Sequence, residues 1–158
     1  MEGLLHFSTV TTGFVKEGPD CNCGNRDWFT QGDDQWVCSN CNRTRQAAHR
    51  GVIESGPECN CGHYGWFVGN EIVRCSYCNR TRDAILRGYI VNGPECNCGH
   101  RDWFVGNEIV RCSYCNRTRD AVFQGFFLNG PKCNCGHHDW FVGQNVYRCS
   151  YCNRTRNK

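Results

Sequence analysis

Short apolar runs alternate with polar turns along this chain, and the alternation repeats four times. Each repeat opens with a glycine followed by two apolar residues, which predicts a short β-strand. The four openings are Gly13-Phe14-Val15, Gly51-Val52-Ile53, Gly88-Tyr89-Ile90 and Gly125-Phe126-Phe127. A Gly-Pro pair follows each opening, at residues 18–19, 56–57, 93–94 and 130–131, and predicts a turn.

A hairpin is predicted later in each repeat. In the third repeat Trp103-Phe104-Val105 precedes the turn residues Gly106-Asn107, and Glu108-Ile109-Val110-Arg111 follows them. β-forming residues around a Gly-Asn turn are a strong hairpin signal. The first repeat has one extra residue in this turn, within residues 31–34, and hairpin tips tolerate such insertions.

The repeats divide the chain into small units. Their first cysteines lie at positions 21, 59, 96 and 133, which is a period of 37 or 38 residues. We predict an N-terminal tail or cap at residues 1–12, followed by unit 1 (13–50), unit 2 (51–87), unit 3 (88–124) and unit 4 (125–158). A unit this small cannot bury enough apolar surface to fold unaided, so each needs a further source of stability.

The sixteen cysteines supply that source. Every unit carries C-x-C and then C-x-x-C, with the hairpin between the two pairs, and this pattern suits a tetrahedral Zn²⁺ site. The predicted ligands are Cys21, Cys23, Cys38 and Cys41; Cys59, Cys61, Cys75 and Cys78; Cys96, Cys98, Cys112 and Cys115; and Cys133, Cys135, Cys149 and Cys152. We therefore predict four Zn²⁺ ions, one per repeat, although four thiolates also suit iron.

Disulfides are the rival interpretation of the cysteines. A bond between Cys21 and Cys23 would close a very tight ring. The first twenty residues lack the basic start and long apolar run of a secretion signal, and no run approaches the roughly 18 apolar residues of a membrane span. We expect an intracellular, cytoplasmic protein or a virion component, with reduced cysteines.

The residue after each cysteine pair supports the metal sites independently. It is a glycine after the first pair and an asparagine after the second, at positions 24, 62, 99 and 136 and at positions 42, 79, 116 and 153. Glycine and asparagine are the residues that best tolerate a positive φ. A chain that wraps around a metal needs this conformation to direct its amides at the sulfurs.

Two cysteine pairs joined by a hairpin, with a further strand, resemble the zinc-ribbon family over residues 13–158. The first pair departs from the family pattern, because it is C-x-C and not C-x-x-C. The resemblance implies a small all-β fold, here a tandem array of four zinc-ribbon-like modules stabilised by metal. It also implies a binding or structural module, and zinc ribbons bind DNA, RNA and proteins alike.

The segments between units are apolar, as in Ala84-Ile85-Leu86 and Tyr89-Ile90-Val91. They either pack neighbouring units together into a semi-rigid rod or complete the core of their own unit. The Trp-Phe pair that recurs in each unit is either core or a platform for stacking bases. Residues 1–12 contain Leu4, Leu5 and Phe7, and would cap unit 1 or insert into a partner.

Arginines and tyrosines beside the second cysteine pair form the candidate partner-binding set. They are Arg43, Arg45, Arg80, Arg82, Arg117, Arg119, Arg154, Arg156, Tyr77, Tyr114 and Tyr151. Such a ladder could track a nucleic-acid backbone and stack bases. Alternatively, the arginines offset the charge of each zinc–thiolate site, because sixteen thiolates and four Zn²⁺ turn the formal charge of +3 into a net negative one.

We therefore predict a non-catalytic, multivalent zinc-binding repeat protein. Four cysteines per metal leave no open coordination position, and no catalytic motif recurs. His63, His100 and His137 follow the first cysteine pair but are not needed as ligands, since unit 1 has Asn25 there. The predicted role is structural or protein-binding, through a protein partner or self-assembly in a viral or filamentous assembly, and nucleic-acid binding by a tandem zinc ribbon is the alternative.

Overall fold

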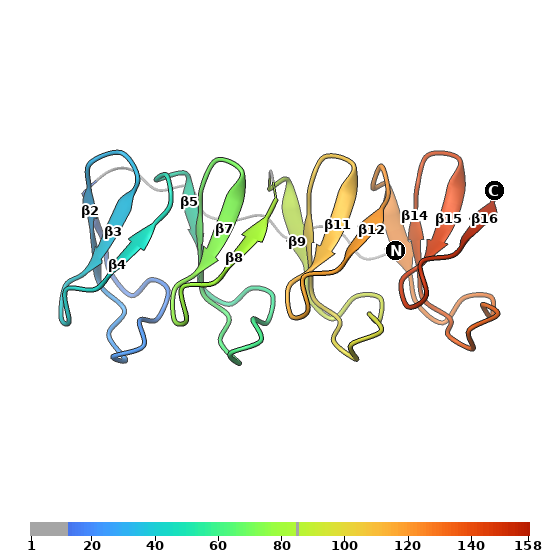
Figure 1. Cartoon of the computed structure of the whole chain (residues 1–158), viewed down its shortest axis with the longest axis horizontal. Coiled ribbons are helices and arrows are strands. Elements are labelled where there is room, and N and C mark those ends of the chain that lie inside the picture. The colour runs from blue at the N-terminus through green and yellow to red at the C-terminus, as the bar shows by residue number, and fades with distance from the viewer. Residues whose placement is uncertain (1–12, 85) are drawn as a thin grey trace.

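A computed structural model describes residues 13–84 and 86–158, and these form an all-β array (Figure 1). Within the described residues there are sixteen strands in four antiparallel sheets, and each sheet lies inside one predicted unit. Every sheet has four strands that follow one another in chain order. The predicted fold class, a tandem array of small modules each with a cysteine cluster, is confirmed.

The strands recur at equivalent positions. Unit 1 contains β1 (Phe14–Val15), β2 (Trp28–Gln31), β3 (Gln35–Cys38) and β4 (Thr44–Gln46). Unit 2 contains β5 (Gly51–Ile53), β6 (Trp66–Val68), β7 (Ile72–Cys75) and β8 (Thr81–Asp83). Unit 3 contains β9 (Gly88–Ile90), β10 (Trp103–Val105), β11 (Ile109–Cys112) and β12 (Thr118–Asp120). Unit 4 contains β13 (Gly125–Phe127), β14 (Trp140–Val142), β15 (Val146–Cys149) and β16 (Thr155–Asn157).

The last strand of each sheet was not predicted from the sequence. It is formed by the Thr-Arg pair and the residue after it, as in β8, which pairs Arg82 with Val73 and Thr81 with Arg74. Period-2 alternation explains this strand, because Arg82 is buried while Asp83 is exposed. The buried position of this strand, where an apolar residue is usual, is occupied by an arginine.

The sheet register positions each tryptophan beside the metal ligands. Trp66 lies opposite Cys75 across the central pair of strands, and the tryptophans of the other three units lie opposite the equivalent cysteines. The indole Nε1 of Trp66 donates to the carbonyl of Pro57 at 2.8 Å, which fastens the Gly-Pro turn under the ring. The hairpin thus closes the two cysteine pairs around one point.

The second strand of the sheet buries residues on both of its faces in units 2, 3 and 4. Trp66 and Val68 pack in the core of unit 2, whereas Phe67 packs on Trp28 and Trp36 of unit 1. In the same way Phe104 of unit 3 completes the core around Trp66. The apolar segments between units do both things that the sequence allowed: Ile90 lies in the core of its own unit 3, and Tyr89 packs in the core around Trp66 of the preceding unit.

The four sheets lie in a row along the longest axis of the molecule (Figure 1). Hairpin tips lie along one side of the row and the loops that carry the first cysteine pair lie along the other. We call the side of a unit that meets the next unit its front face, and the side that meets the preceding unit its rear face. The predicted cap at residues 1–12 and the segment residue Ile85 lie outside the described residues.

In the part of the chain that the structure describes, no helix is both long enough and apolar enough to cross a membrane.

Candidate metal centres and the contacts between units

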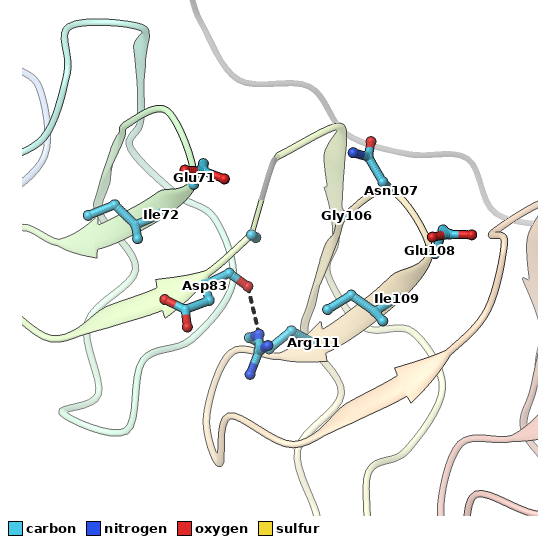
Figure 2. Close-up of a pocket in the computed structure, with 9 residues that line it drawn as sticks. Glu71, Ile72, Asp83, Gly106, Asn107, Glu108, Ile109 and Arg111 are labelled. Atoms are coloured by element: carbon cyan, nitrogen blue, oxygen red, sulfur yellow. Dashed lines mark hydrogen bonds between the residues drawn. The ribbon is translucent and has the colours of Figure 1, made fainter.

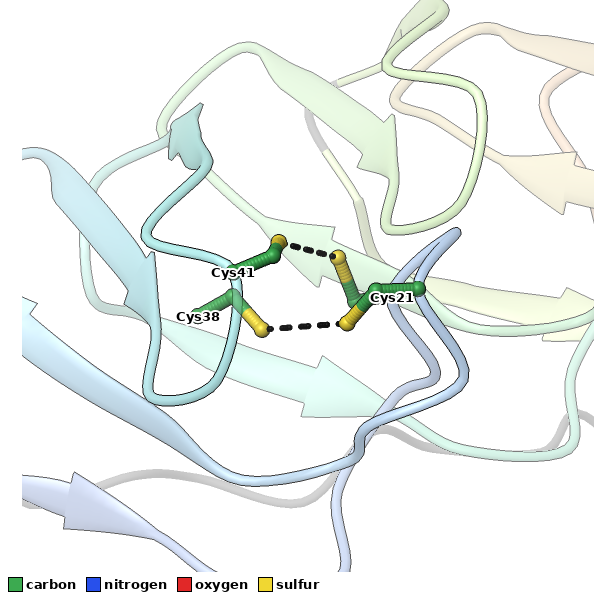
Figure 3. A group of neighbouring side chains, drawn as sticks. Cys21, Cys38 and Cys41 are labelled. Carbon is green, nitrogen blue, oxygen red and sulfur yellow. Dashed lines mark hydrogen bonds between the residues drawn. The ribbon is translucent and has the colours of Figure 1, made fainter.

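The structure brings the four cysteines of every unit together. In each cluster the four sulfur atoms lie within 4.8 Å of one another, and the clusters are those predicted from the sequence. The sulfurs of Cys59 and Cys78 are 3.5 Å apart, and those of Cys61 and Cys75 are 3.7 Å apart. A tetrahedral Zn²⁺ with Zn–S bonds of about 2.3 Å requires sulfurs about 3.8 Å apart. Figure 3 shows the same arrangement in unit 1.

All sixteen cysteines are free thiols in the described residues. The sulfurs of Cys21 and Cys41 are 3.6 Å apart, far beyond the roughly 2.05 Å of a disulfide bond. One cysteine of each pair is buried and the other lies nearer the surface. This geometry fits a metal held between two hairpin-linked loops, and it does not fit the disulfide alternative.

The backbone at each cluster has the conformation that the sequence predicted. Gly62, after the first pair of unit 2, has φ +91°, and Asn79, after the second pair, has φ +71°. The equivalent glycines and asparagines of the other units share these values within a few degrees. A Cβ at Gly62 would meet nothing within 4 Å, so the glycine is required by its φ and not by space. The prediction of positive φ at these eight positions is confirmed.

Neighbouring sulfurs and amides set the proton affinity of each cluster. The pKa of Cys59 is lowered to about 5, first because the Cys75 thiol donates to its sulfur and further because the Cys61 amide does so. The same hydrogen bond, together with burial, raises the pKa of Cys75. Unit 3 repeats the pattern at Cys96 and Cys112. The clusters of units 2 and 3 thus hold a thiolate beside a proton that a metal ion would displace.

Four thiolates at this spacing fit one tetrahedral metal ion per unit. Zinc and iron both accept such a ligand set, and zinc is typical of four-cysteine sites in small modules. Bound there, the ion would cross-link the two loops of the unit. The cysteines of each site already fill four positions, so the ion would have no open position for a substrate.

The predicted arginine ladder divides into two rows. The outer row lies beside the clusters: Arg43, Arg80, Arg117 and Arg154 are exposed. Arg80 donates to Asn60 Oδ1 at 2.9 Å, and hydrogen bonding to Cys78 raises its pKa. Arg43 makes the equivalent contacts with Asn22 and Cys41. These arginines compensate the negative charge of the clusters while their outer edges face solvent.

Three of the four inner-row arginines are buried between units. Arg45, Arg82 and Arg119 are only 4–5% exposed. Arg82 lies over the Trp66 ring and donates through Nε to Ser113 O at 2.8 Å and through Nη2 to Tyr114 O at 3.3 Å. Arg45 and Arg119 make the same bonds to the next unit. We therefore correct the sequence prediction for these three, since the neighbouring unit already occupies their donors.

Arg156, the fourth member of the inner row, is exposed. Its guanidinium lies over Trp140 at 5.5 Å and donates to the carbonyl of its own unit's Lys132 at 3.2 Å. It therefore keeps the stacking contact of Arg82 but lacks the two bonds to another unit.

The histidines and tyrosines also lie at the contacts between units. His100 stacks on Tyr114 of its own unit, with ring centroids 3.5 Å apart, and its Nδ1 is 3.2 Å from Glu58 of the preceding unit. His63 and His137 make equivalent pairs with Asp20 and Glu95. The histidines are not among the metal ligands of the described clusters. Tyr77, Tyr114 and Tyr151 are half-buried, because a stacked histidine covers one face of each ring.

Two further residues fasten the units and were not found from the sequence. Ser113, within the second cysteine pair of unit 3, is buried and donates to Glu58 O of unit 2 at 2.6 Å. Asp102 accepts from the Glu58 amide of unit 2 and from the Asn92 amide of its own unit. A serine in the cysteine pair and an aspartate before the tryptophan recur, but nothing in their local pattern indicates a contact with another unit.

Two equivalent grooves run along the hairpin-tip side where units meet. The groove between units 2 and 3, of about 470 Å³, is lined by Glu71, Ile72, Asp83, Ala84, Gly106, Asn107, Glu108, Ile109 and Arg111 (Figure 2). Arg111 crosses its base and donates to Asp83 O at 2.7 Å. The groove between units 3 and 4 has about 610 Å³ and is lined by the equivalent residues, including Glu108, Ile109 and Asp120. Both combine isoleucine with carboxylates.

No family model matches the chain, and no curated protein or solved structure matches it either.

Proposed function

We propose that the protein is a non-catalytic zinc-binding rod that offers repeated binding sites to protein partners. The observation that carries this proposal is the repetition of one contact at all three junctions between units. At each junction an arginine binds two carbonyls of the next unit and a phenylalanine packs edge-on against a tryptophan. Contacts of this kind would hold successive surfaces at a fixed spacing.

The proposed role of zinc is structural. A four-thiolate site cross-links its unit and has no position left for a substrate or an activated water. The outer-row arginines and the backbone amides at the cysteine pairs stabilise the thiolates. Neither group offers a nucleophile or a general base. Each metal therefore serves to fold a unit that is too small to fold on its own apolar core.

The two grooves at the junctions are the candidate protein-binding sites. Carboxylates of Glu71, Asp83 and Glu108 surround Ile72 and Ile109 in the first groove. Such a groove favours an extended segment with basic residues around an apolar side chain. Because the grooves lie one unit apart, a segment or filament with a matching repeat would bind both and gain avidity.

A peptide selection tests this role. Random peptides would be selected on the zinc-loaded chain and counter-selected on an Ile72→Asp, Ile109→Asp double variant. We expect the enriched peptides to be basic and apolar, and to bind the variant at least tenfold more weakly. Tyr64→Ser is the matched control, because Tyr64 is an exposed aromatic that lines neither groove. Peptides that bind both chains equally would contradict the groove assignment.

Nucleic-acid binding is the competing role, and the outer row of arginines is the feature that favours it. Arg43, Arg80, Arg117 and Arg154 are exposed and recur once per unit. Labelled single- and double-stranded oligonucleotides would be titrated with the zinc-loaded chain at low and near-physiological salt. Binding that weakens steeply with salt, and is lost when Arg80, Arg117 and Arg154 become glutamine, would replace the protein-binding proposal. No binding at low salt would leave these arginines as counter-charges to the clusters.

A further inference from the structure

The rear face of unit 1 exposes the residues that other units bury against a neighbour. Phe29 is 50% exposed, whereas its equivalents Phe67, Phe104 and Phe141 are fully buried. Phe14 beside it is 47% exposed, whereas Val52, Tyr89 and Phe126 at the same position are buried. The two rings pack on each other at 5.1 Å and form an apolar surface. This surface has the composition of the rear faces that dock on a preceding unit.

The front face of unit 4 shows the complementary exposure. Pro131 is exposed, while Pro19, Pro57 and Pro94 at the same position are buried. A hollow of about 280 Å³ lies beside it, lined by Phe127, Pro131, Trp140, Tyr147, Arg156 and Asn157. In units 1–3 the tryptophan equivalent to Trp140 receives a phenylalanine from the next unit, with ring centroids 4.8 Å apart. The hollow therefore has the composition of a site for one more rear face.

We infer that the rear face of unit 1 in one copy of this chain binds the front face of unit 4 in another, so that copies join head to tail. The inference rests on the proposed rod and names a partner for it, a second copy. The occupant follows from continuity with the three junctions inside the chain, since both end faces retain the residues that form those junctions. An interface between two different faces extends the rod when the rotation between copies does not close them into a ring.

Each contact of an internal junction has a counterpart in this pairing. Phe29 takes the place of Phe104 and packs on Trp140. Arg156 takes the place of Arg82 and binds the carbonyls of Ser39 and Asn40, which are equivalent to Ser113 and Tyr114. Ser39 Oγ takes the place of Ser113 Oγ and donates to Lys132 O, the carbonyl that Arg156 now occupies at 3.2 Å.

Polar residues of the two end faces also match each other. The acidic residue that pairs with histidine at each internal junction is replaced by Lys132 in unit 4, and the histidine is replaced by Asn25 in unit 1. A lysine facing an asparagine can donate a hydrogen bond to its oxygen. The head-to-tail pairing therefore replaces the ion pair of the internal junctions with a hydrogen-bonding pair.

Sedimentation of the zinc-loaded, full-length chain tests the inference. We expect the weight-average mass to rise continuously with protein concentration. Phe29→Ser removes the rear-face ring and Arg156→Glu reverses the front-face charge, so each variant alone should remain a monomer. Tyr64→Ser, which alters an aromatic 47% exposed on neither end face, should associate like the parent chain.

Mixing the two variants gives the decisive result. The Phe29→Ser chain keeps its front face and the Arg156→Glu chain keeps its rear face, so an equimolar mixture should form dimers that do not grow further. A parent chain that stays monomeric, or that stops growing at a dimer, would overturn the inference. A mixture of the two variants that forms no dimers would also overturn it. So would association that occurs only after residues 1–12 are deleted, because that segment would then be the occupant of the rear face.

The inference and the proposed function fail in different ways. A chain that is a monomer but keeps groove-dependent peptide binding would contradict head-to-tail joining and leave the proposed function standing. A chain that joins head to tail but selects no groove-dependent peptide would contradict the grooves alone.

Discussion

The same residue types form the junction between units 2 and 3 and the free front face of unit 4. The arginine among them is buried at the junction and exposed at the free face. At the junction Arg82 is 5% exposed and bonds to two carbonyls of unit 3, while at the free face Arg156 is exposed and turns back to its own unit. Both lie over a tryptophan at about the same distance. The comparison shows that the unit itself positions the arginine, and that the neighbour buries it.

The cores differ in the same way. The core around Trp103 in unit 3 includes Phe126 and Phe141, which belong to unit 4. The core around Trp140 has only Cys133 and Cys149 as its other buried members in the described residues. Units 2, 3 and 4 therefore each give rear-face residues to the core of the unit before them, and among the described residues unit 4 receives none. We expect hydrogen exchange to be faster in β14 and β15 than in β10 and β11.

Removing the metal should have the largest effect, because it unfolds the units that form both the junctions and the free front face. A strong chelator withdraws the cross-link that contributes about 10–16 kcal/mol per site in small zinc modules. We expect loss of the β-sheet circular dichroism signal and of protected amides in all four units, with recovery when zinc is restored. Sheets that persist in the chelated chain would show that packing between units suffices to fold them.

Truncating a rear-face phenylalanine should cost much more stability at a junction between units than at the free rear face of unit 1. Phe104→Ala removes a fully buried ring that packs on Trp66, and we expect a loss of about 3–5 kcal/mol in the stability of the unit 2–3 region. Phe29→Ala alters a half-exposed ring and should cost no more than about 0.5 kcal/mol at low protein concentration. Hydrogen exchange in β6 and β2 measures the two effects. Equal costs would mean that the junction does not exist in solution.

Removing the inner-row arginines should give the next largest contrast. Arg82→Ala leaves the carbonyls of Ser113 and Tyr114 buried without a donor, and we expect a cost of about 2–4 kcal/mol. Arg156→Ala removes an exposed side chain, and its cost should stay within about 0.5 kcal/mol. Arg82→Lys is the matched control and should recover little, because a lysine cannot reach two carbonyls with a planar fork. Urea unfolding with zinc present measures all three.

Replacing the serine within the second cysteine pair should give the smallest difference in stability between a junction and the free rear face. Ser113→Ala removes the hydrogen bond to Glu58 O across the junction and should cost about 1 kcal/mol. Ser39→Ala removes a hydroxyl that, among the described residues, accepts from Asn25 of its own unit, so we expect little change at low protein concentration. Thermal unfolding of the two variants compares them, and a larger loss for Ser39→Ala would contradict the assignment of Ser113 to the junction.

Local chemistry could be predicted from the sequence, while contacts between units could not. The cysteine clusters, the Gly-Asn hairpin of unit 3 and the positive φ of Gly62 and Asn79 all follow from residues close together in the chain. The fourth strand was missed because its buried residue, Arg82, is polar and is buried only by unit 3.

The arginines show the same limit within the candidate site. Arg80 and Arg82 lie two positions apart and looked alike in the sequence, but β8 begins at Thr81, so only Arg82 belongs to the strand and is buried in the junction. Period-2 alternation could not have separated them, because residues two positions apart in one strand lie on the same face. The partner of Arg82 could still not have been identified, because Ser113 lies 31 residues further along the chain.

The repeated arginine and phenylalanine contacts should join the four units into one rod in solution. Residual dipolar couplings of the zinc-loaded chain, measured on an Arg156→Glu background that keeps it monomeric, test this claim directly. We expect the amides of all four units to fit a single alignment tensor, and Arg82→Ala to split the fit between units 1–2 and units 3–4. Four independent tensors in the Arg156→Glu chain, or a single tensor that survives Arg82→Ala unchanged, would contradict the claim.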